Sequence, residues 1–162
     1  MKIILHDLDR RYDALIESRC DRAIAADGQY TPCQGCFGCW TKHPAECALK
    51  DSLHQVCRVI GQADELVTVT KNLYGGYSAA VKNVLDRSIG TSTPFSTYRG
   101  GQMHHTLRYG RHETWRVLVY GEITEAEQET FRLLAARNAV NDGFARSEVR
   151  FLSDLSELEA LL

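Results

Sequence analysis

The residues of this chain best suited to chemistry are four cysteines in the segment TPCQGCFGCWTKHPAEC. They are Cys33, Cys36, Cys39 and Cys47, with the spacing C-x2-C-x2-C-x7-C. Three thiols at successive intervals of three lie on one tight, glycine-containing loop and the fourth returns near a proline, which is typical of loops that bind iron–sulfur clusters. The segment therefore predicts an inorganic redox centre with these four cysteines as ligands.

Other interpretations of the same thiols remain open. Structural zinc sites usually collect their thiolates as two separated pairs, whereas the middle cysteine of an evenly spaced triplet belongs to no pair. Cys33 with Cys36, or Cys36 with Cys39, also forms a C-x-x-C pair suited to thiol–disulfide exchange, and idle thiols are the last alternative. Cys20 and Cys57 fall at helical spacing among apolar residues, so we expect both to pack in the core.

Length and composition limit the class of protein. At 162 residues the chain is long enough for one domain with a substantial core, so we expect a single domain over residues 1–162. With 19 Lys and Arg against 21 Asp and Glu, it lacks the charge of a protein that binds nucleic acid or anionic lipid. The N-terminus does not resemble a secretion signal and no stretch suits a membrane span. We therefore expect a cytoplasmic protein whose thiols stay reduced.

Short apolar runs alternate along the chain with helical stretches. Strands are predicted at Lys2–His6, Gly28–Pro32, Asp64–Thr70, Trp115–Tyr120 and Glu148–Leu152, and helices at Arg10–Ala26, from Ser52, from Ser78, at Thr124–Asn141 and at Ser153–Leu162. This βα alternation predicts an α/β protein with a doubly wound, five-stranded parallel sheet. The ligand crevice of such a sheet lies at the carboxyl ends of its strands.

Local signals mark some of the boundaries. Ser52 with Gln55, and Thr124 with Glu127, have the spacing of capping boxes, and Gly143 supplies a helix stop. The polar segment from residue 90 to residue 114 is too long for a plain connection, and its scattered apolar residues indicate an ordered flap or a subunit contact. The adjacent pair His104 and His105 lacks the spacing of metal ligands on a helix.

Two segments together resemble a known family. The run QGCFGCW, the aspartate Asp51 and the run YGGYSAAVKNVLDRS are similar to the flavodoxin-like NAD(P)H-dependent FMN reductases, and among these to the iron–sulfur flavoproteins. The resemblance implies strand order 2-1-3-4-5, FMN over the carboxyl edge of the sheet, and a 4Fe-4S cluster near the flavin. It also implies NAD(P)H or a redox protein as electron donor, and a homodimer or homotetramer.

The resemblance assigns site residues as well. The cluster ligands are the four cysteines already named, and the loop at the flavin edge comprises Asn72, Leu73, Tyr74, Gly75, Gly76 and Tyr77. Gly121 lies on the other edge of the implied crevice. Paired glycines allow a backbone to approach a flat ring closely, and Tyr74 or Tyr77 would cover that ring.

The loop after the first strand departs from the family. Relatives hold the FMN phosphate there with Ser, Thr and Gly, but this chain has His6-Asp7-Leu8-Asp9-Arg10-Arg11. Carboxylates disfavour a phosphate, although Arg10 and Arg11 offer compensating charge. The alternative is a solvated helix start capped by Asp9.

The sequence thus leaves two hypotheses. The first is a flavodoxin-like oxidoreductase or electron carrier that uses FMN together with an iron–sulfur cluster. The second is a cofactor-poor binding or scaffold protein with a degenerate phosphate loop, whose cysteine loop holds zinc or nothing.

Overall fold

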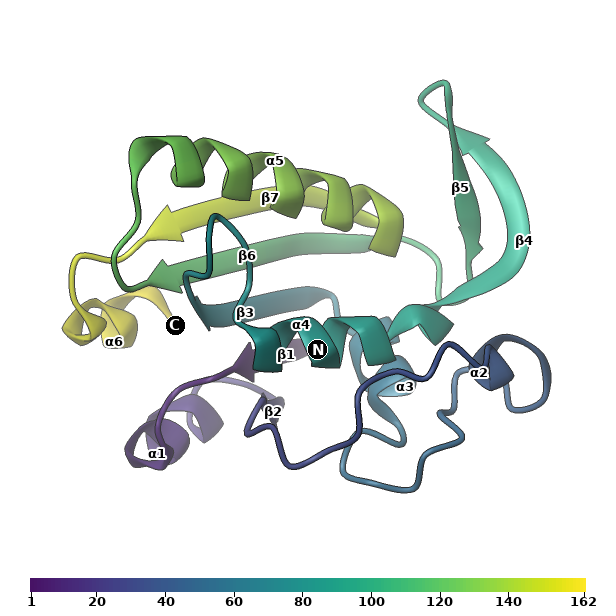
Figure 1. Cartoon of the computed structure of the whole chain (residues 1–162), viewed down its shortest axis with the longest axis horizontal. Helices are drawn as coiled ribbons and strands as arrows, with labels where there is room; N and C mark the ends of the chain where they lie inside the picture. Colours follow the sequence, from purple (N-terminus) through teal and green to yellow (C-terminus); the bar gives the residue numbers. More distant parts are fainter.

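The computed structural model describes all residues from 1 to 162 and is built around a parallel sheet of five strands (Figure 1). The strands are β1 (Lys2–His6), β2 (Arg22–Ala25), β3 (Glu65–Lys71), β6 (His112–Tyr120) and β7 (Phe144–Phe151). Their order across the sheet is β2-β1-β3-β6-β7, and each neighbouring pair is parallel. Counted within this sheet alone, the order is the predicted 2-1-3-4-5, so the predicted fold class is confirmed.

Helices cover both faces of this sheet. On one face lie α3 (Val56–Gly61), α4 (Ala79–Arg87) and α5 (Glu125–Asp142), and on the other lie α1 (Asp13–Glu17) and α6 (Leu158–Leu161). Successive residues of a strand point to opposite faces, so Ile3 and Leu5 join the core beneath α3 to α5, whereas Ile4 joins the smaller core beneath α1 and α6. Strands buried on both faces are typical of doubly wound proteins.

The helix α5 starts and ends where its sequence predicts. Thr124 accepts a hydrogen bond from the Glu127 backbone N–H, and the Glu127 carboxylate accepts one from the Thr124 backbone N–H, which completes the predicted capping box. Gly143 ends the helix with a φ of 85°, a left-handed conformation that glycine adopts without steric cost.

Two elements near the N-terminus differ from the prediction. The second strand is Arg22–Ala25 rather than Gly28–Pro32, and the helix predicted over Arg10–Ala26 is reduced to a 3-10 turn at Arg10–Tyr12 and the short α1. Residues 22–25 pair in parallel with β1, which satisfies their backbone groups. Pairing with a distant strand has therefore overridden the local helical pattern.

The helix after the cysteine loop also begins later than predicted. Ser52 does not cap it, because α3 begins at Val56 and its N-cap residue Gln55 makes no capping bond. Instead the Asp51 carboxylate accepts a hydrogen bond from the Leu53 backbone N–H at 3.1 Å and holds the preceding residues in turns. At the C-terminus, β7 starts four residues before the predicted strand, and the predicted helix is divided into a 3-10 turn at Leu155–Glu157 and α6.

The long polar segment is ordered, as predicted. The strands β4 (Ser92–Arg99) and β5 (Gln102–Leu107) form an antiparallel hairpin, which follows a 3-10 turn at Ile89–Thr91. A short helix, α2 (Gly38–Thr41), lies in the cysteine loop. This hairpin stands away from the parallel sheet (Figure 1). His105 contacts Trp40 of α2 with a ring separation of 4.6 Å. The role of the hairpin as a subunit contact stays a prediction.

None of the helices combines the length and the apolar composition needed to cross a lipid bilayer.

Candidate functional site

The four predicted ligand cysteines line one pocket. This pocket has a volume of about 450 Å³ and lies between the loop of residues 33–49 and the C-terminal end of α4. Its walls also include Phe37, Ala48, Leu49, Asp86, Arg87 and Ile89. All four thiols are free, with Cys33 and Cys36 exposed, Cys47 half-buried and Cys39 buried. The structure therefore brings together residues that are up to fourteen positions apart in the chain, and Cys39 lies on the inner side.

Tight backbone geometry shapes the pocket. Gly35 and Phe37 both adopt left-handed conformations, with φ of 63° and 53°, which bends the chain between successive cysteines. On the inner side, a β-carbon added to Gly90 would lie 3.0 Å from the Cβ atom of Cys39 and 2.8 Å from the sulfur of Cys57. Glycine at position 90 thus allows the close approach of two thiol-bearing segments.

Burial and neighbouring thiols disfavour free thiolates here. Burial raises the pKa of the Cys39 thiol, and the nearby Cys47, Cys33 and Cys36 add to this increase. Cys57, which is buried as predicted, has a pKa raised to about 12, mainly by burial and then by Cys39. The other three cysteines of the loop therefore each lie near enough to Cys39 to influence its pKa.

A buried cation lies against this group of thiols. The Arg87 side chain is inaccessible to solvent and donates two hydrogen bonds to Asp51, at 2.7 Å from Nη2 and 2.8 Å from Nη1. Nη1 also donates to the Thr31 carbonyl at 2.6 Å. This bidentate pairing holds the pKa of the Asp51 carboxyl well below its usual range, at about 2. The sequence contained both residues in the family-like runs, but nothing in the spacing indicated that they would meet.

The four thiols line one pocket but are not gathered around a single point. No three His, Cys, Asp or Glu side chains are grouped closely enough to hold one metal ion. Tetrahedral zinc needs four sulfurs at about 2.3 Å from one point. The ligands of an iron–sulfur cluster instead bind separate iron atoms, so their sulfurs surround a volume. Four free thiols around one pocket, beside a buried guanidinium, fit that donor set.

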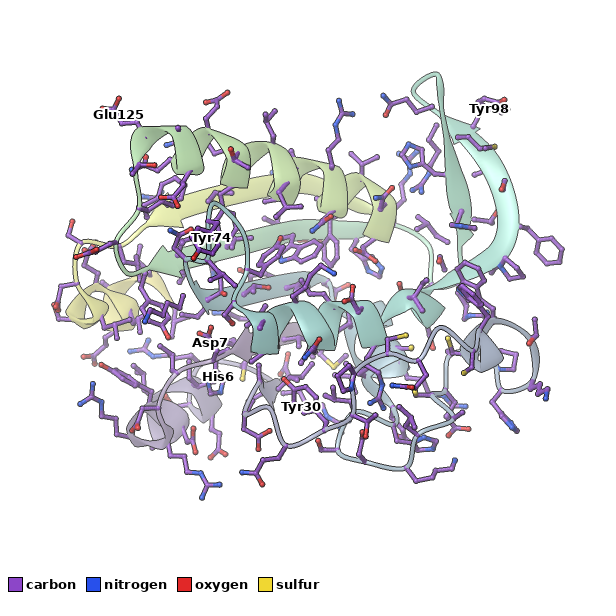
Figure 2. All side chains as sticks on the ribbon, in the orientation of Figure 1. His6, Asp7, Tyr30, Tyr74, Tyr98 and Glu125 are labelled. Carbon is purple, nitrogen blue, oxygen red and sulfur yellow. The ribbon has the colours of Figure 1, made fainter.

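The predicted flavin-edge loop, residues 72–77, forms a tight turn between β3 and α4. Tyr74 is 86% exposed and has a φ of 52°, whereas Tyr77 is 5% exposed and packs against Trp115 and Phe131 in the core. Of the two tyrosines predicted to cover a flavin ring, only Tyr74 is at the surface (Figure 2). Tyr77 is a core residue, because its ring lies on the face of the sheet covered by α5.

This loop also contacts the opposite edge of the implied crevice. The Asn72 side chain donates to the Glu122 carbonyl at 2.8 Å, beside Gly121, whose φ is 92°. A β-carbon at Gly75 would lie 3.0 Å from the Glu127 carbonyl of α5. Gly75 therefore allows the close contact between this loop and α5, and the bond from Asn72 ties the loop to the segment that contains Gly121.

The carboxyl end of β1 does not fit the phosphate of FMN. The Asp7 carboxylate accepts a hydrogen bond from the Lys71 backbone N–H at 3.0 Å, and the Asp9 carboxylate accepts one from the Arg11 backbone N–H. The small cavity beside this end, about 290 Å³, includes the carboxylates of Asp13 and Asp27 and one cation, Arg10. Asp9 thus occupies a backbone donor of the loop after β1, and the neighbouring carboxylates add negative charge that disfavours a phosphate.

The two predicted sites lie at opposite ends of α4. The flavin-edge loop precedes α4, whose N-cap is Ser78, whereas the cysteine pocket is lined by Asp86 and Arg87 at its C-terminal end. A helix of nine residues is about 13 Å long. Figure 1 shows α2 beyond one end of α4 and the loop of residues 72–77 beyond the other. The two predicted sites are therefore separated by about the length of this helix, and the implied proximity of a cluster to a flavin stays a prediction.

Comparisons with known proteins agree with this architecture. No family model matches the chain. A curated iron–sulfur flavoprotein from Archaeoglobus fulgidus is 32% identical over 62 residues, which are 38% of this chain and 29% of that protein. The match therefore covers less than a third of the relative's length.

Solved structures match almost the whole chain. The NAD(P)H:quinone oxidoreductase from Methanothermobacter marburgensis has a TM-score of 0.59 at 15% identity, covering 99% of this chain and 93% of that one. The chain has the flavodoxin-like fold. The FMN-dependent NADH-azoreductase from Bacillus anthracis, in complex with FMN, has a TM-score of 0.55 at 12% identity, covering 98% and 92%. The predicted resemblance is confirmed, and at these identities it establishes the fold, while function depends on the site.

Proposed function

We propose that this chain is a one-electron oxidoreductase, an electron carrier of flavodoxin-like fold with a 4Fe-4S cluster bound by Cys33, Cys36, Cys39 and Cys47. The observation that carries the proposal is the single pocket lined by all four thiols, with the buried Arg87 in its wall. When bound, such a cluster takes up and releases single electrons. The protein's own part is to hold the cluster, orient it and set its potential.

The pocket has an inner and an outer side. Cys39 and the backbone of Gly90 close the inner side, which excludes water. Cys33 and Cys36 lie on the outer side, and the neighbouring Phe37 is 47% exposed. An electron donor or acceptor is expected to approach over this outer side, where thiol ligands and an aromatic ring reach the surface.

A redox protein is the electron donor that we propose. NAD(P)H transfers a hydride, which carries two electrons, whereas an iron–sulfur cluster accepts one electron at a time. A direct hydride transfer therefore needs a flavin, and the residues at the end of β1 do not fit the phosphate of FMN. The names of the structural neighbours favour both FMN and NAD(P)H, so flavin content and NAD(P)H oxidation are measured as well.

The test is an anaerobic preparation of the protein reconstituted with iron and sulfide. We expect about four irons per chain, with matching acid-labile sulfide, a broad visible absorption that bleaches on reduction, and flavin well below one per chain. About one zinc with no iron would instead support the scaffold hypothesis. Neither metal, or stoichiometric flavin without iron, would contradict the proposal.

Two variants locate the cluster. Cys36→Ser removes a proposed ligand on the outer side of the pocket and is expected to lower iron content sharply. Cys20→Ser is the matched control, because the half-buried Cys20 lies in the other core and its thiol donates to the Ile16 carbonyl. Equal iron content in the two variants would contradict the assignment of Cys36 as a cluster ligand.

We propose a homodimer or homotetramer as the assembly. The hairpin of β4 and β5 supports this, because Phe95, Tyr98 and Met103 are exposed at 72%, 77% and 66% (Tyr98 is labelled in Figure 2). Light scattering of the purified protein gives the mass that decides the question.

A further inference from the structure

The side chain of Arg87 has more hydrogen-bonding capacity than the protein uses. Its two terminal nitrogens bond Asp51 and Thr31, but its Nε–H group is buried and has no partner. Buried donors without a partner are rare in folded proteins, and each calls for an explanation. Arg87 also lines the cysteine pocket, where Cys47 is close enough to raise the pKa of the guanidinium further, after the larger effect of Asp51.

The bonds of Arg87 and Asp51 also close the cysteine loop. Asp51 accepts hydrogen bonds from the Thr31 and Leu53 backbone N–H groups, both at 3.1 Å. Thr31 lies before the first ligand cysteine and Leu53 after the last. The Arg87 backbone carbonyl accepts a bond from the Cys57 thiol at 3.2 Å, which ties it to α3. Both ends of the loop are thus fastened to the ion pair of Asp51 and Arg87.

We propose that Arg87 is the counter-charge of the group held in the cysteine pocket, and that its buried guanidinium favours the reduced form of a cluster there. The inference rests on the proposed function. A cluster with four thiolates is net negative and becomes more negative when it gains an electron. A cation in its wall stabilises the reduced form more than the oxidised form, and charge and hydrogen bonds to sulfur are known determinants of cluster potential.

Asp51 has the opposite electrostatic effect. It is the anion that neutralises Arg87, so its removal leaves the cation uncompensated. The pair therefore makes a prediction that a purely structural role does not make. Arg87→Gln is expected to lower the reduction potential and Asp51→Asn is expected to raise it, although each variant breaks the same ion pair.

The experiment is a potentiometric titration of the reconstituted protein, followed by electron paramagnetic resonance, with iron content and circular dichroism measured on the same samples. For Arg87→Gln we expect at least a tenfold shift of the one-electron equilibrium toward the oxidised form, which is about 59 mV. Arg116→Gln is the control for loss of an arginine charge away from the pocket, since Arg116 forms a partly exposed ion pair with Glu65 at 2.6 Å. Its potential is expected to match that of the wild type.

Several results would overturn the inference. These are a fully loaded Arg87→Gln protein at the wild-type potential, shifts of the same sign in Arg87→Gln and Asp51→Asn, or an equal shift in Arg116→Gln. If Arg87→Gln retains no cluster, Arg87→Lys decides, because it keeps the charge. Retention of the cluster in Arg87→Lys supports a role for the charge, whereas loss in both variants shows a packing role only. A wild-type protein without a cluster is a different result, which rejects the proposed function itself.

Discussion

The backbone of Gly90 lies directly against the Cys57 thiol. A β-carbon at position 90 would lie 2.8 Å from the Cys57 sulfur, closer than such atoms approach in real proteins, and 3.0 Å from the Cys39 Cβ atom. Cys57 is fully buried and Cys39 nearly so, which leaves neither residue space to move away. Gly90 therefore fixes how deeply Cys39 lies in the pocket.

Gly90→Ala tests this contact. We expect the added methyl group to cost about 1–3 kcal/mol of unfolding free energy, the usual effect of overpacking a core, and to lower the iron content by displacing Cys39. Gly38→Ala is the control within the same loop, because its β-carbon would meet Cys36 at an ordinary 3.7 Å. Urea denaturation and iron analysis give the two readouts. Full iron content in Gly90→Ala would show that the pocket tolerates the shift.

The ion pair of Asp51 and Arg87 predicts a loss of stability in acid. The pKa of Asp51 is lowered from 3.8 to about 2 in the folded protein, so its contribution is complete above pH 3.8 and is lost as the pH falls toward 2. The difference in pKa corresponds to about 2 kcal/mol. Urea denaturation between pH 2 and pH 5 measures it, and Asp51→Asn should lack this part of the pH dependence. Parallel curves for the two proteins would contradict the assignment.

For Asp142 we expect the opposite dependence of stability on pH. Burial is the main cause that raises its pKa from 3.8 to about 6, while Thr91 and Arg99 lower it less. The folded state therefore binds the proton more tightly than the unfolded state. The resulting stabilisation is complete below pH 3.8 and is lost as the pH rises through 6.

We expect Asp142→Asn to stabilise the protein at pH 8 by about 3 kcal/mol at most, because it removes a partly buried charge and keeps an acceptor for the Thr91 hydroxyl. At pH 4 the variant and the wild type should be nearly equal. Thermal or urea unfolding at the two pH values checks this. A variant that is less stable at both values would show that the charge is compensated in the folded protein.

The capping box of α5 predicts a modest effect of Thr124 on the stability of the folded protein. Thr124→Ala removes the oxygen that accepts from the Glu127 backbone N–H, at a cost of about 1 kcal/mol. Thr124→Ser keeps this oxygen and should restore most of the lost stability. Iron content should be unchanged in both variants, because α5 does not line the cysteine pocket. Urea denaturation separates the two substitutions.

Much of the fold was predictable because it depends on local signals. The apolar runs of β1 and β3 fix two central strands, and the Thr124 capping box with Gly143 fixes α5. The predicted bounds of helices and strands were wrong where the local structure depends on contacts with residues distant in the chain. Residues 22–25 become a strand because β1 is beside them, and Ser52 does not cap α3 because this helix begins only at Val56.

The candidate site was likewise predictable only in part. The spacing of the four cysteines alone predicted a common site, since residues three apart on a glycine-containing loop stay close in any compact conformation. Their position relative to the loop of residues 72–77 was not predictable, because it depends on which end of α4 each loop occupies.

By itself, the sequence determined four of the five strands, the helices α4 and α5, and the grouping of thiols, because these follow from periodicity and short-range spacing. Only the tertiary structure decided that Arg87 lies buried beside those thiols, that Gly90 lies against Cys39, and that Asp7 accepts a hydrogen bond from the Lys71 backbone N–H at the end of β3. These relationships join residues tens of positions apart, and they arise only when the sheet and α4 bring their ends together.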